Sequence, residues 1–415
     1  MMHSPSPLAL RQTLLGAIAL LAAALPAPGT TILHAFSGSG GDGKAPAAPL
    51  LYVGGKLLGT TTNGGVGTNS GTVFTINPDG TGYSIVHNFA SSGSEGTGTE
   101  GLLALSGSTI YGTNPFGPNN FNSGTVWKMD VSGSGFAVLH TFTSLDANGY
   151  DPTGGVTLGG STLYGTTYNG GNGSFLYKVG IDGTGFTKMF SLSSGVAGHL
   201  TLVGTTLYGT TYNAGTSNAG TLFKIGIDGT GYTVLHNFLG TAAADGSSPR
   251  GELTLVGSTF YGATGGGGTD NQGTIFKINT DGTGYGVVRQ FLSGAGQANQ
   301  PQGGLLQAGS VFFGSSYGGQ YSVGTVFQMN LDGTGFSILN DFKGQPTDGS
   351  GPLGNLVEIN SKLYGVTATG GPSLNPGTVF SAPAPEPGTV ALGLLAGALL
   401  SQGRPRPGRR NGTVG

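Results

Sequence analysis

The sequence predicts an all-β fold in which seven repeats between residues 31 and 382 form a seven-bladed β-propeller. Three observations support this prediction. Four short strings recur in phase about every 51 residues, and seven copies fill the region. Each copy contains four segments with the alternating pattern of short β-strands. The repeated region also begins and ends inside the same hairpin of the repeat, as a closed ring requires.

The strings that define the repeat are easily followed along the chain. The turn string Asp-Gly-Thr-Gly-aromatic begins at Asp79, Asp182, Asp228, Asp281 and Asp332, with a degenerate copy at Ser132. The string Leu-Tyr-Gly, or a variant of it, ends at Gly59, Gly112, Gly165, Gly209, Gly262, Gly314 and Gly365. Strings of the form Gly-Thr-Val-Phe and His-x-Phe keep the same step. Self-similarity at a fixed period is typical of repeat architectures.

Each repeat is expected to contain four strands and no helix. In the fifth copy we expect strands over Gly251–Val256, Thr259–Ala263, Gly273–Asn279 and Tyr232–Phe238. These segments are rich in β-branched and aromatic residues, and the Gly, Asp and Asn residues between them are hairpin turn chemistry. No window in the repeats shows an apolar period of 3.6 residues long enough for a helix.

The two ends of the repeat region favour a closed ring. Thr31–Phe36 corresponds to the second half of the hairpin at the Asp-Gly-Thr-Gly turn, and Gly377–Phe380 corresponds to its first half. Each segment would be an unpaired edge in an open array, and unpaired edges promote aggregation. Pairing them completes the seventh blade. An open β-solenoid is the alternative.

Residues 1–29 have the features of a signal peptide for export. Arg11 provides positive charge, the apolar run Thr13–Leu25 is too short for a membrane span, and small residues follow it. We expect cleavage after about Ala24, with Ala27 as the other possibility. A frayed N-terminal helix is the alternative.

Residues 383–410 resemble the PEP-CTERM sorting tail of Gram-negative bacteria, and residues 411–415 are expected to be a disordered tail. A Pro-Glu-Pro motif precedes the apolar Thr389–Leu400, which spans only about 18 Å as a helix. Arginines follow the apolar segment, and by the positive-inside rule this basic end is expected to stay on the cytoplasmic side of the membrane. The motif residues are Pro385, Glu386, Pro387, Arg404, Arg406, Arg409 and Arg410. The resemblance implies transient anchoring in the inner membrane and processing by an exosortase. A plain membrane anchor is the alternative.

The repeats themselves resemble the Gloeo/Verruco (GloVer) tandem repeat. The resemblance rests on strings such as GTIFKINTDGTGY, LHNF and STLYGTTYNGG, and it covers the whole repeat region. It implies an exported bacterial protein of the cell surface, the outer membrane or the exopolysaccharide matrix. It brings no established catalytic activity.

Composition excludes several classes of function. Glycine and proline make up 85 and 21 of the 415 residues, but 36 Phe and Tyr residues and few charges indicate a folded chain. Between residues 31 and 382, 11 basic residues stand against 17 acidic ones, which does not favour a nucleic-acid partner. The absence of cysteine excludes disulfides and thiolate metal sites.

Motifs that usually indicate chemistry are better explained here by the repeat. The G-x-S-x-G string at Gly314–Gly318 has no histidine after it, since the last one is His236. Matches to G-x-G-x-x-G at Gly38 and Gly96 open no helix, so no cofactor is expected. One repeat column contains four histidines that are expected to form hydrogen bonds between blades, namely His34, His87, His140 and His236. Calcium is left open at two loops, Gly265–Asp270 and Asp146–Asp151.

Two sets of residues are candidates for ligand contact. Carboxylates in the loop after His-x-Phe could form a crown on one face that binds cations, although an Asp-Gly turn explains them as well. They are Asp42, Glu95, Asp146, Asp245 and Asp348. Tyrosines after the Leu-Tyr-Gly string could stack on sugar rings, with packing between blades as the alternative. They are Tyr168, Tyr212 and Tyr317.

The function that these features favour is a non-enzymatic surface or matrix protein that binds polysaccharide weakly and at several points. The alternative is a propeller enzyme, a polysaccharide lyase or hydrolase. Catalysis would require an acid/base pair that departs from the repeat. The charged residues that do so are Glu100, Asp151, Arg250, Glu252 and Glu358. A cluster of them at the channel mouth would favour an enzyme, and a scatter would favour a binding scaffold.

Overall fold

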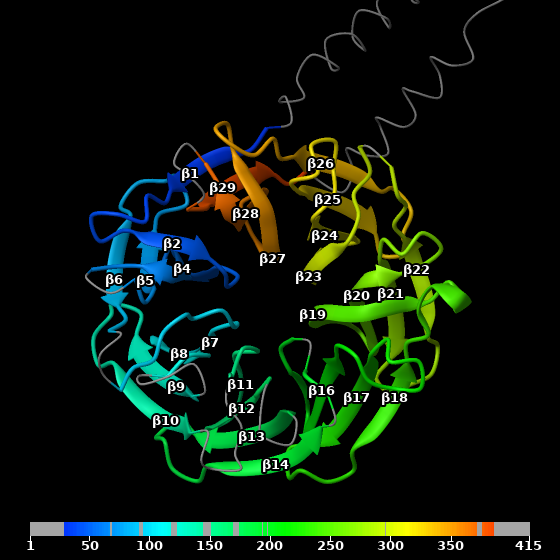
Figure 1. Cartoon of the computed structure of the whole chain (residues 1–415), viewed down its shortest axis with the longest axis horizontal. Helices are drawn as coiled ribbons and strands as arrows, with labels where there is room; N and C mark the ends of the chain where they lie inside the picture. The colour runs from blue at the N-terminus through cyan, green and yellow to red at the C-terminus, as the bar shows by residue number, and fades with distance from the viewer. Residues whose placement is uncertain are drawn as a thin grey trace, which may run out of the picture.

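The computed structural model describes residues 29–385 except 67–68, 91–93, 118–122, 144–150, 169–173, 193, 197, 295 and 372–375. The described residues form seven antiparallel sheets arranged as the blades of a closed ring (Figure 1). The predicted seven-bladed β-propeller is therefore confirmed, and the chain is not an open solenoid. Each blade has four strand positions from the ring centre to its rim.

The strands of each blade are given from the centre outward. Blades 1 and 2 contain, in turn, β2 (Gly43–Pro46) with β3 (Leu51–Val53), β4 (Lys56–Gly64), β5 (Thr72–Ile76) and β6 (Ser84–Asn88), and then β7 (Ala104–Ser106), β8 (Thr109–Asn114), β9 (Ser123–Asp130) and β10 (Ala137–Thr143). Blades 3 and 4 contain, in turn, β11 (Val156–Gly159), β12 (Thr162–Thr166), β13 (Ser174–Gly180) and β14 (Thr187–Leu192), and then β15 (Thr201–Val203), β16 (Thr206–Thr211), β17 (Thr221–Gly226) and β18 (Thr233–Asn237).

Blade 5 contains, from the centre outward, β19 (Gly246–Val256), β20 (Thr259–Gly267), β21 (Thr274–Asn279) and β22 (Gly286–Gln290). Blade 6 contains β23 (Pro301–Ala308), β24 (Val311–Ser316), β25 (Thr325–Asn330) and β26 (Ser337–Asp341). Blade 7 contains β27 (Gly349–Ile359), β28 (Lys362–Gly370), β29 (Thr378–Pro383) and β1 (Thr31–Ala35). A short 3-10 helix, η1 (Gly240–Ala243), lies between β18 and β19.

The glycine of the Leu-Tyr-Gly string has a packing role. In blade 5 the ring of Phe276 on β21 lies over Gly262 on β20, and a Cβ at Gly262 would come within 2.5 Å of the ring's Cζ. Gly59 and Phe74 in blade 1 have the same relation. The aromatic residue of the third strand therefore requires glycine opposite it on the second strand. This pairing explains why the two strings recur in phase.

The ring closes as the sequence predicts. β1 pairs with β29 in antiparallel fashion, with Thr31 opposite Ser381 and Ala35 opposite Thr378. The outer strand of blade 7 thus comes from the start of the chain and its other three strands come from the end, which places β1 beside β29 at the rim in Figure 1.

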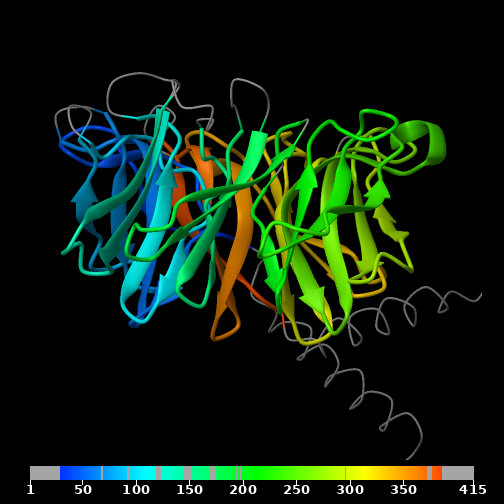
Figure 2. The ribbon, with the colours of Figure 1, turned by 90° about the horizontal axis from the view of Figure 1, so that it is seen from below.

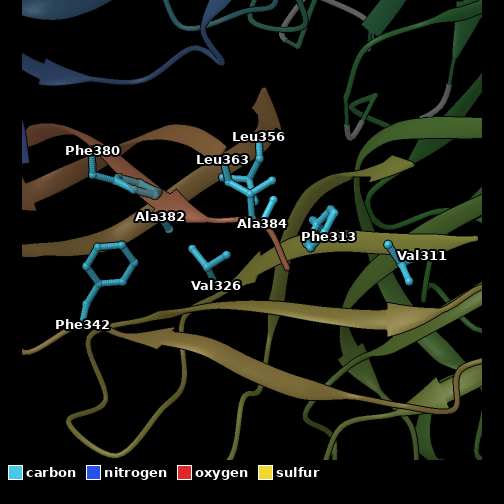
Figure 3. Packing of buried hydrophobic residues seen from close by; sticks show 9 residues of the cluster. All are labelled: Val311, Phe313, Val326, Phe342, Leu356, Leu363, Phe380, Ala382 and Ala384. Carbon is cyan, nitrogen blue, oxygen red and sulfur yellow. The ribbon is translucent and has the colours of Figure 1, made fainter. Parts of the chain in front are cut away.

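The hydrophobic core lies between neighbouring blades. Within the described residues it divides into seven clusters, each formed by side chains of two adjacent blades. Figure 3 shows the cluster between blades 6 and 7, where Phe342 and Phe380 meet with ring centroids 5.1 Å apart. Among the described residues the core clusters all lie between blades, so each blade depends on its neighbours.

Seen from the side, the molecule is a thick disc with two different faces (Figure 2). Loops after the second and fourth strand of each blade lie on one face, which we call the loop face. Hairpin turns after the first and third strand lie on the other, the turn face. In the third-strand turn of blade 5, Asp281 accepts hydrogen bonds from the backbone nitrogen and the hydroxyl of Thr283, at 2.8 and 2.7 Å.

Candidate functional site

The three candidate tyrosines occupy one structural position on the loop face. Tyr168, Tyr212 and Tyr317 each lie three residues after the glycine of the Leu-Tyr-Gly string, where the second strand of blades 3, 4 and 6 ends. Their side chains are 50, 38 and 38 % exposed. Three partly exposed tyrosines therefore occupy equivalent positions on the loop face.

Backbone hydrogen bonds hold the tyrosines in place, whereas their side chains remain partly exposed. The backbone nitrogen of Tyr168 donates to the carbonyl of Asp151 at 2.9 Å, and that of Tyr212 donates to Gly195 at 3.0 Å. The ring of Tyr168 also packs on Gly195 of the next blade, where an added Cβ would lie 2.6 Å from Cε2. Packing between blades and partial exposure thus occur together at Tyr168, and sugar contact stays a prediction.

The candidate carboxylates of blades 1 and 5 lie in the interfaces between blades, where Asp245 is buried and Asp42 partly buried. Asp42 accepts hydrogen bonds from the Tyr83 hydroxyl at 2.6 Å and from the backbone nitrogen of Ser37 at 2.7 Å, and its Oδ1 lies 3.3 Å from His34 Nε2. Burial alone would raise the pKa of Asp42, but these hydrogen bonds outweigh it and hold the pKa below its usual value. The expected hydrogen bonding of the histidine column between blades is confirmed here.

Asp245 repeats the same arrangement one half-turn around the ring. It accepts hydrogen bonds from the Tyr285 hydroxyl and from the backbone nitrogen of Leu239 at 3.0 Å, and its Oδ2 lies 3.0 Å from His236 Nε2. Its pKa is also lowered, because these bonds outweigh the effect of burial. The carboxylate oxygens therefore already have donors from the protein, which leaves cation binding by the crown a prediction without support from this geometry.

The remaining candidate carboxylates have fewer hydrogen-bond partners among the described residues than Asp42 and Asp245, or lie outside these residues. Glu95 approaches His87 Nε2 at 3.3 Å and accepts from the backbone nitrogen of Ala90 at 3.0 Å. Asp348 accepts from the backbone nitrogen of Lys343 at 2.7 Å, and burial raises its pKa above the usual value. Asp146 lies outside the described residues.

The inner strands carry a polar contact that sequence analysis did not predict. Asn355 on β27 donates to Glu252 on β19 at 2.7 Å, two blades away, and its side-chain oxygen accepts from the backbone nitrogen of Gly304 on β23 at 2.6 Å. His199 occupies the same column in blade 4 and lies 2.9 Å from the carbonyl of Val156. The signal in the sequence was the residue after the inner-strand glycine, which varies from copy to copy.

The charged residues that depart from the repeat are scattered. Arg250 donates to neutral Gln302 at 2.9 Å. Burial and, secondarily, the negative charge of Asp151 raise the pKa of the Glu100 carboxyl. Glu358 lies at a separate pocket of about 240 Å³ that Pro385 also lines. Three pairs of a histidine and a carboxylate lie within 4 Å, and in the described part of the chain no group of three or more His, Asp and Glu residues is placed to hold a metal ion.

The calcium candidates are placed only in part. Asp270 accepts hydrogen bonds from the hydroxyl and the backbone nitrogen of Ser293, at 2.9 and 3.1 Å. Most of the second loop, 146–151, lies outside the described residues, as do residues 1–28 of the predicted signal peptide and the residues of the predicted sorting motif after Pro385. A search of the described residues for a helix long and apolar enough to span a membrane found none.

Among the solved structures to which the chain is similar, one with a TM-score above 0.5 agrees with the fold. An oligogalacturonate lyase in complex with manganese is 10 % identical, with a TM-score of 0.55 over 87 % of this chain and 94 % of that one. The computationally designed Ika8 protein is 13 % identical, with a TM-score of 0.46 over 83 and 98 % of the two chains. A structure from an analysis of two prolyl endopeptidases is 10 % identical, with a TM-score of 0.48 over 87 % of this chain and 52 % of that one. At these identities the likeness concerns the fold alone.

A comparison with curated proteins gives no match. The model of the Gloeobacter/Verrucomicrobia repeat matches twice, over residues 22–206 and 197–392, and so covers most of the chain. With seven repeats, seven blades and this match, the chain belongs to the Gloeobacter/Verrucomicrobia repeat family.

Proposed function

We propose that this protein is an exported, non-enzymatic binding module of the cell surface or the exopolysaccharide matrix, and that it contacts polysaccharide through its loop face. The observation that carries the proposal is the equivalent placement of Tyr168, Tyr212 and Tyr317, each half exposed at the same position of its blade. Aromatic rings with one open face are suited to stacking on the apolar face of a sugar ring.

Such contacts are weak singly and become useful in number. A single exposed stacking contact contributes on the order of 1 kcal/mol, which gives little affinity for a free monosaccharide. A polysaccharide offers many identical sugars, so binding at one tyrosine raises the effective concentration at the next. The rigid ring keeps the three rings in fixed relative positions and lowers the entropy cost of simultaneous contact.

The geometry gives less support to the enzyme alternative. Arg250 and Glu252 each have a neutral amide partner, and Glu358 lies at another pocket. Glu100 is close enough to Asp151 for that charge to raise its pKa, but both groups are acids, and burial is the larger cause of the shift. No specific observation favours a lyase or hydrolase over a binding module.

We also propose that the tail directs the protein through the exosortase route. The order Pro-Glu-Pro, short apolar segment and arginines supports this. Mass spectrometry of the protein recovered from the cell surface should show loss of the chain after about Pro385–Pro387. Recovery of surface protein that still carries Arg410 would contradict the proposal.

The binding proposal can be tested on a glycan array with a variant in which Tyr168, Tyr212 and Tyr317 are all alanine. Tyr52→Ala is a matched control, because Tyr52 is 46 % exposed but lies on β3 beside the first turn, on the turn face. We expect the triple variant to lose retention on polysaccharide and Tyr52→Ala to keep it. Equal retention by the wild type and the triple variant would reject the tyrosine face, and turnover of any glycan would reject the non-enzymatic function.

A further inference from the structure

A ring from one blade stacks on the outer strand of the previous blade at six of the seven interfaces. The ring belongs to the aromatic residue that follows the third-strand turn, and its partner belongs to the histidine column or replaces it. The pairs are His34–Tyr83, His87–Phe136, His140–Phe186, Phe190–Tyr232, His236–Tyr285 and Arg289–Phe336, with separations of 3.5 to 4.3 Å. These contacts make a recurrent slot for an aromatic ring at the rim of the disc.

Two of these slots hold a tyrosine whose hydroxyl binds a carboxylate. The Tyr83 hydroxyl donates to Asp42, which lies eight residues after His34, and the Tyr285 hydroxyl donates to Asp245. The slot therefore recognises a phenol by three features. One side chain stacks on the ring, a carboxylate accepts its hydroxyl, and core aromatic residues contact its edge.

In the seventh slot, between blades 6 and 7, the described residues place no ring at the position that Tyr83 and Tyr285 occupy in theirs. In blade 1, Ser84 opposite Thr75 begins the outer strand, and Tyr83 precedes it. In blade 7 the outer strand begins at Thr31, which lies opposite Ser381, and the register then shifts at the same point as in blade 1. Thr30 therefore occupies the position that corresponds to Tyr83. The cause is topological, because blade 7 is closed by the start of the chain and has no third-strand turn.

The rest of this slot is present. Asn340 occupies the histidine position, and Asp348 lies eight residues later, as Asp42 does after His34. The backbone nitrogen of Lys343 donates to Asp348 at 2.7 Å, as that of Ser37 donates to Asp42. The core pair Phe342 and Phe380, seen in Figure 3, matches Phe36 and Phe74, with centroid separations of 5.1 and 5.2 Å.

A pocket of about 450 Å³ lies at this position, and Thr30, Ile32, Tyr321, Leu339, Asn340 and Asp348 are among the residues that line it. Asn340 is only 8 % exposed, and its side-chain nitrogen has no hydrogen-bond partner among the described residues. Nor does Oδ1 of the neighbouring Asp341, another residue of the lining. Buried polar atoms normally have partners, so unpaired ones beside a pocket point to a ligand.

The pocket is large enough for an aromatic ligand, and its carboxylate differs from those of the filled slots. A dry cavity of roughly 150 Å³ is enough to hold benzene, so this pocket has room for a substituted ring. The contrast between the carboxylates fits as well. Hydrogen bonds hold the pKa of Asp42 below its usual value, whereas burial raises that of Asp348, which lacks both the tyrosine and the histidine donor.

We propose that the pocket between blades 6 and 7 binds a phenolic ring, with the ring against Asn340 and its hydroxyl donating to Asp348. The shared chemistry is that of a phenol, either a small free phenol or the tyrosine side chain of a peptide. This site is separate from the tyrosines of the loop face and does not depend on polysaccharide binding.

The experiment titrates the purified protein with p-cresol and follows binding by ligand-observed NMR and by the shift in melting temperature. We expect a dissociation constant on the order of millimolar, as befits so small a ligand. Toluene, which lacks the hydroxyl, should bind roughly tenfold more weakly, and Asp348→Asn should abolish that difference. N-acetyltyrosinamide and N-acetylphenylalaninamide form the peptide arm, where binding of the first at the same site would identify tyrosine as an acceptable source.

Thr30→Tyr supplies the missing ring, so it should remove p-cresol binding and raise the melting temperature, whereas Thr30→Ser should change neither. The proposal is overturned if p-cresol and toluene bind equally to the wild type, if Thr30→Tyr still binds p-cresol, or if methyl glucoside displaces p-cresol from the pocket. Absence of p-cresol binding by the wild type overturns it too, since the slot is then closed or filled by the chain itself.

Discussion

Replacing Asp245 with asparagine tests whether the carboxylates between blades hold the ring together. Asp245 is 5 % exposed, and its two oxygens accept from the backbone nitrogens of Leu239 and Gly246, at 3.0 and 2.7 Å, and from the Tyr285 hydroxyl. His236 Nε2 lies 3.0 Å from Oδ2. Asparagine keeps one oxygen and places an NH₂ group at the other, where it faces donors.

In either orientation the NH₂ group faces one backbone N–H, of Leu239 or Gly246, which stays buried without an acceptor, and the contacts with the Tyr285 hydroxyl and His236 lose the carboxylate charge. An unsatisfied buried donor costs about 1–3 kcal/mol, so we expect the free energy of unfolding to fall by about 2–4 kcal/mol. Urea unfolding followed by the fluorescence of Trp127, which is the single tryptophan of the chain and is buried, would measure this loss.

Asp281→Asn is the matched control. Asp281 also accepts two hydrogen bonds, but it lies in an exposed turn, so its loss should cost less than about 1 kcal/mol. If the two variants lose the same stability, the reasoning that assigns Asp245 a role between blades is refuted.

Two further predictions concern pH and packing. The pKa values of Asp42 and Asp245 are lowered in the folded state, so the stability that these carboxylates confer should be complete above about pH 4 and should be lost as the pH falls through their folded-state pKa values. Between pH 7 and pH 2, the urea midpoint should therefore fall less in a variant with asparagine at both positions than in the wild type. Gly262→Ala should cost about 1–3 kcal/mol, because its Cβ would lie 2.5 Å from Phe276, whereas Gly286→Ala, with open space around the added methyl group, should change little in the same urea assay. Equal losses in these two glycine variants, or identical pH profiles for the wild type and the asparagine variant, would contradict the respective predictions.

The fold could be predicted because every repeat repeats the same local chemistry. Glycines such as Gly262 and turns such as that at Asp281 recur in phase, so errors in a single copy do not matter. The limits of the inner strands were harder to predict. The expected strand Gly251–Val256 is the end of β19, which begins at Gly246, since the polar residues before Gly251 pair with β20 without any apolar alternation.

The candidate site was predictable only where it lies within one copy. His34 and Asp42 are eight residues apart, and their proximity could have been inferred from that constant spacing. Tyr83 is 41 residues from Asp42 and joins it only because the blades are neighbours in the ring. The contact between Glu252 and Asn355 spans 103 residues and two blades, and no spacing in the sequence indicates it.

Closure of the ring by β1 and β29 is the claim on which the rest of this account depends. The chain has no cysteine, so cysteines at Thr31 and Ser381 can be introduced without competing thiols. These residues face each other in the antiparallel pair, where Cα atoms are about 4.5–5.5 Å apart and a disulfide can form. On oxidation, mass spectrometry should find one disulfide within a monomer, whereas cysteines at Thr31 and at Gln328, which lies one blade away, should stay reduced. Failure of the first pair to join, or joining only between two molecules, would contradict a closed seven-bladed ring.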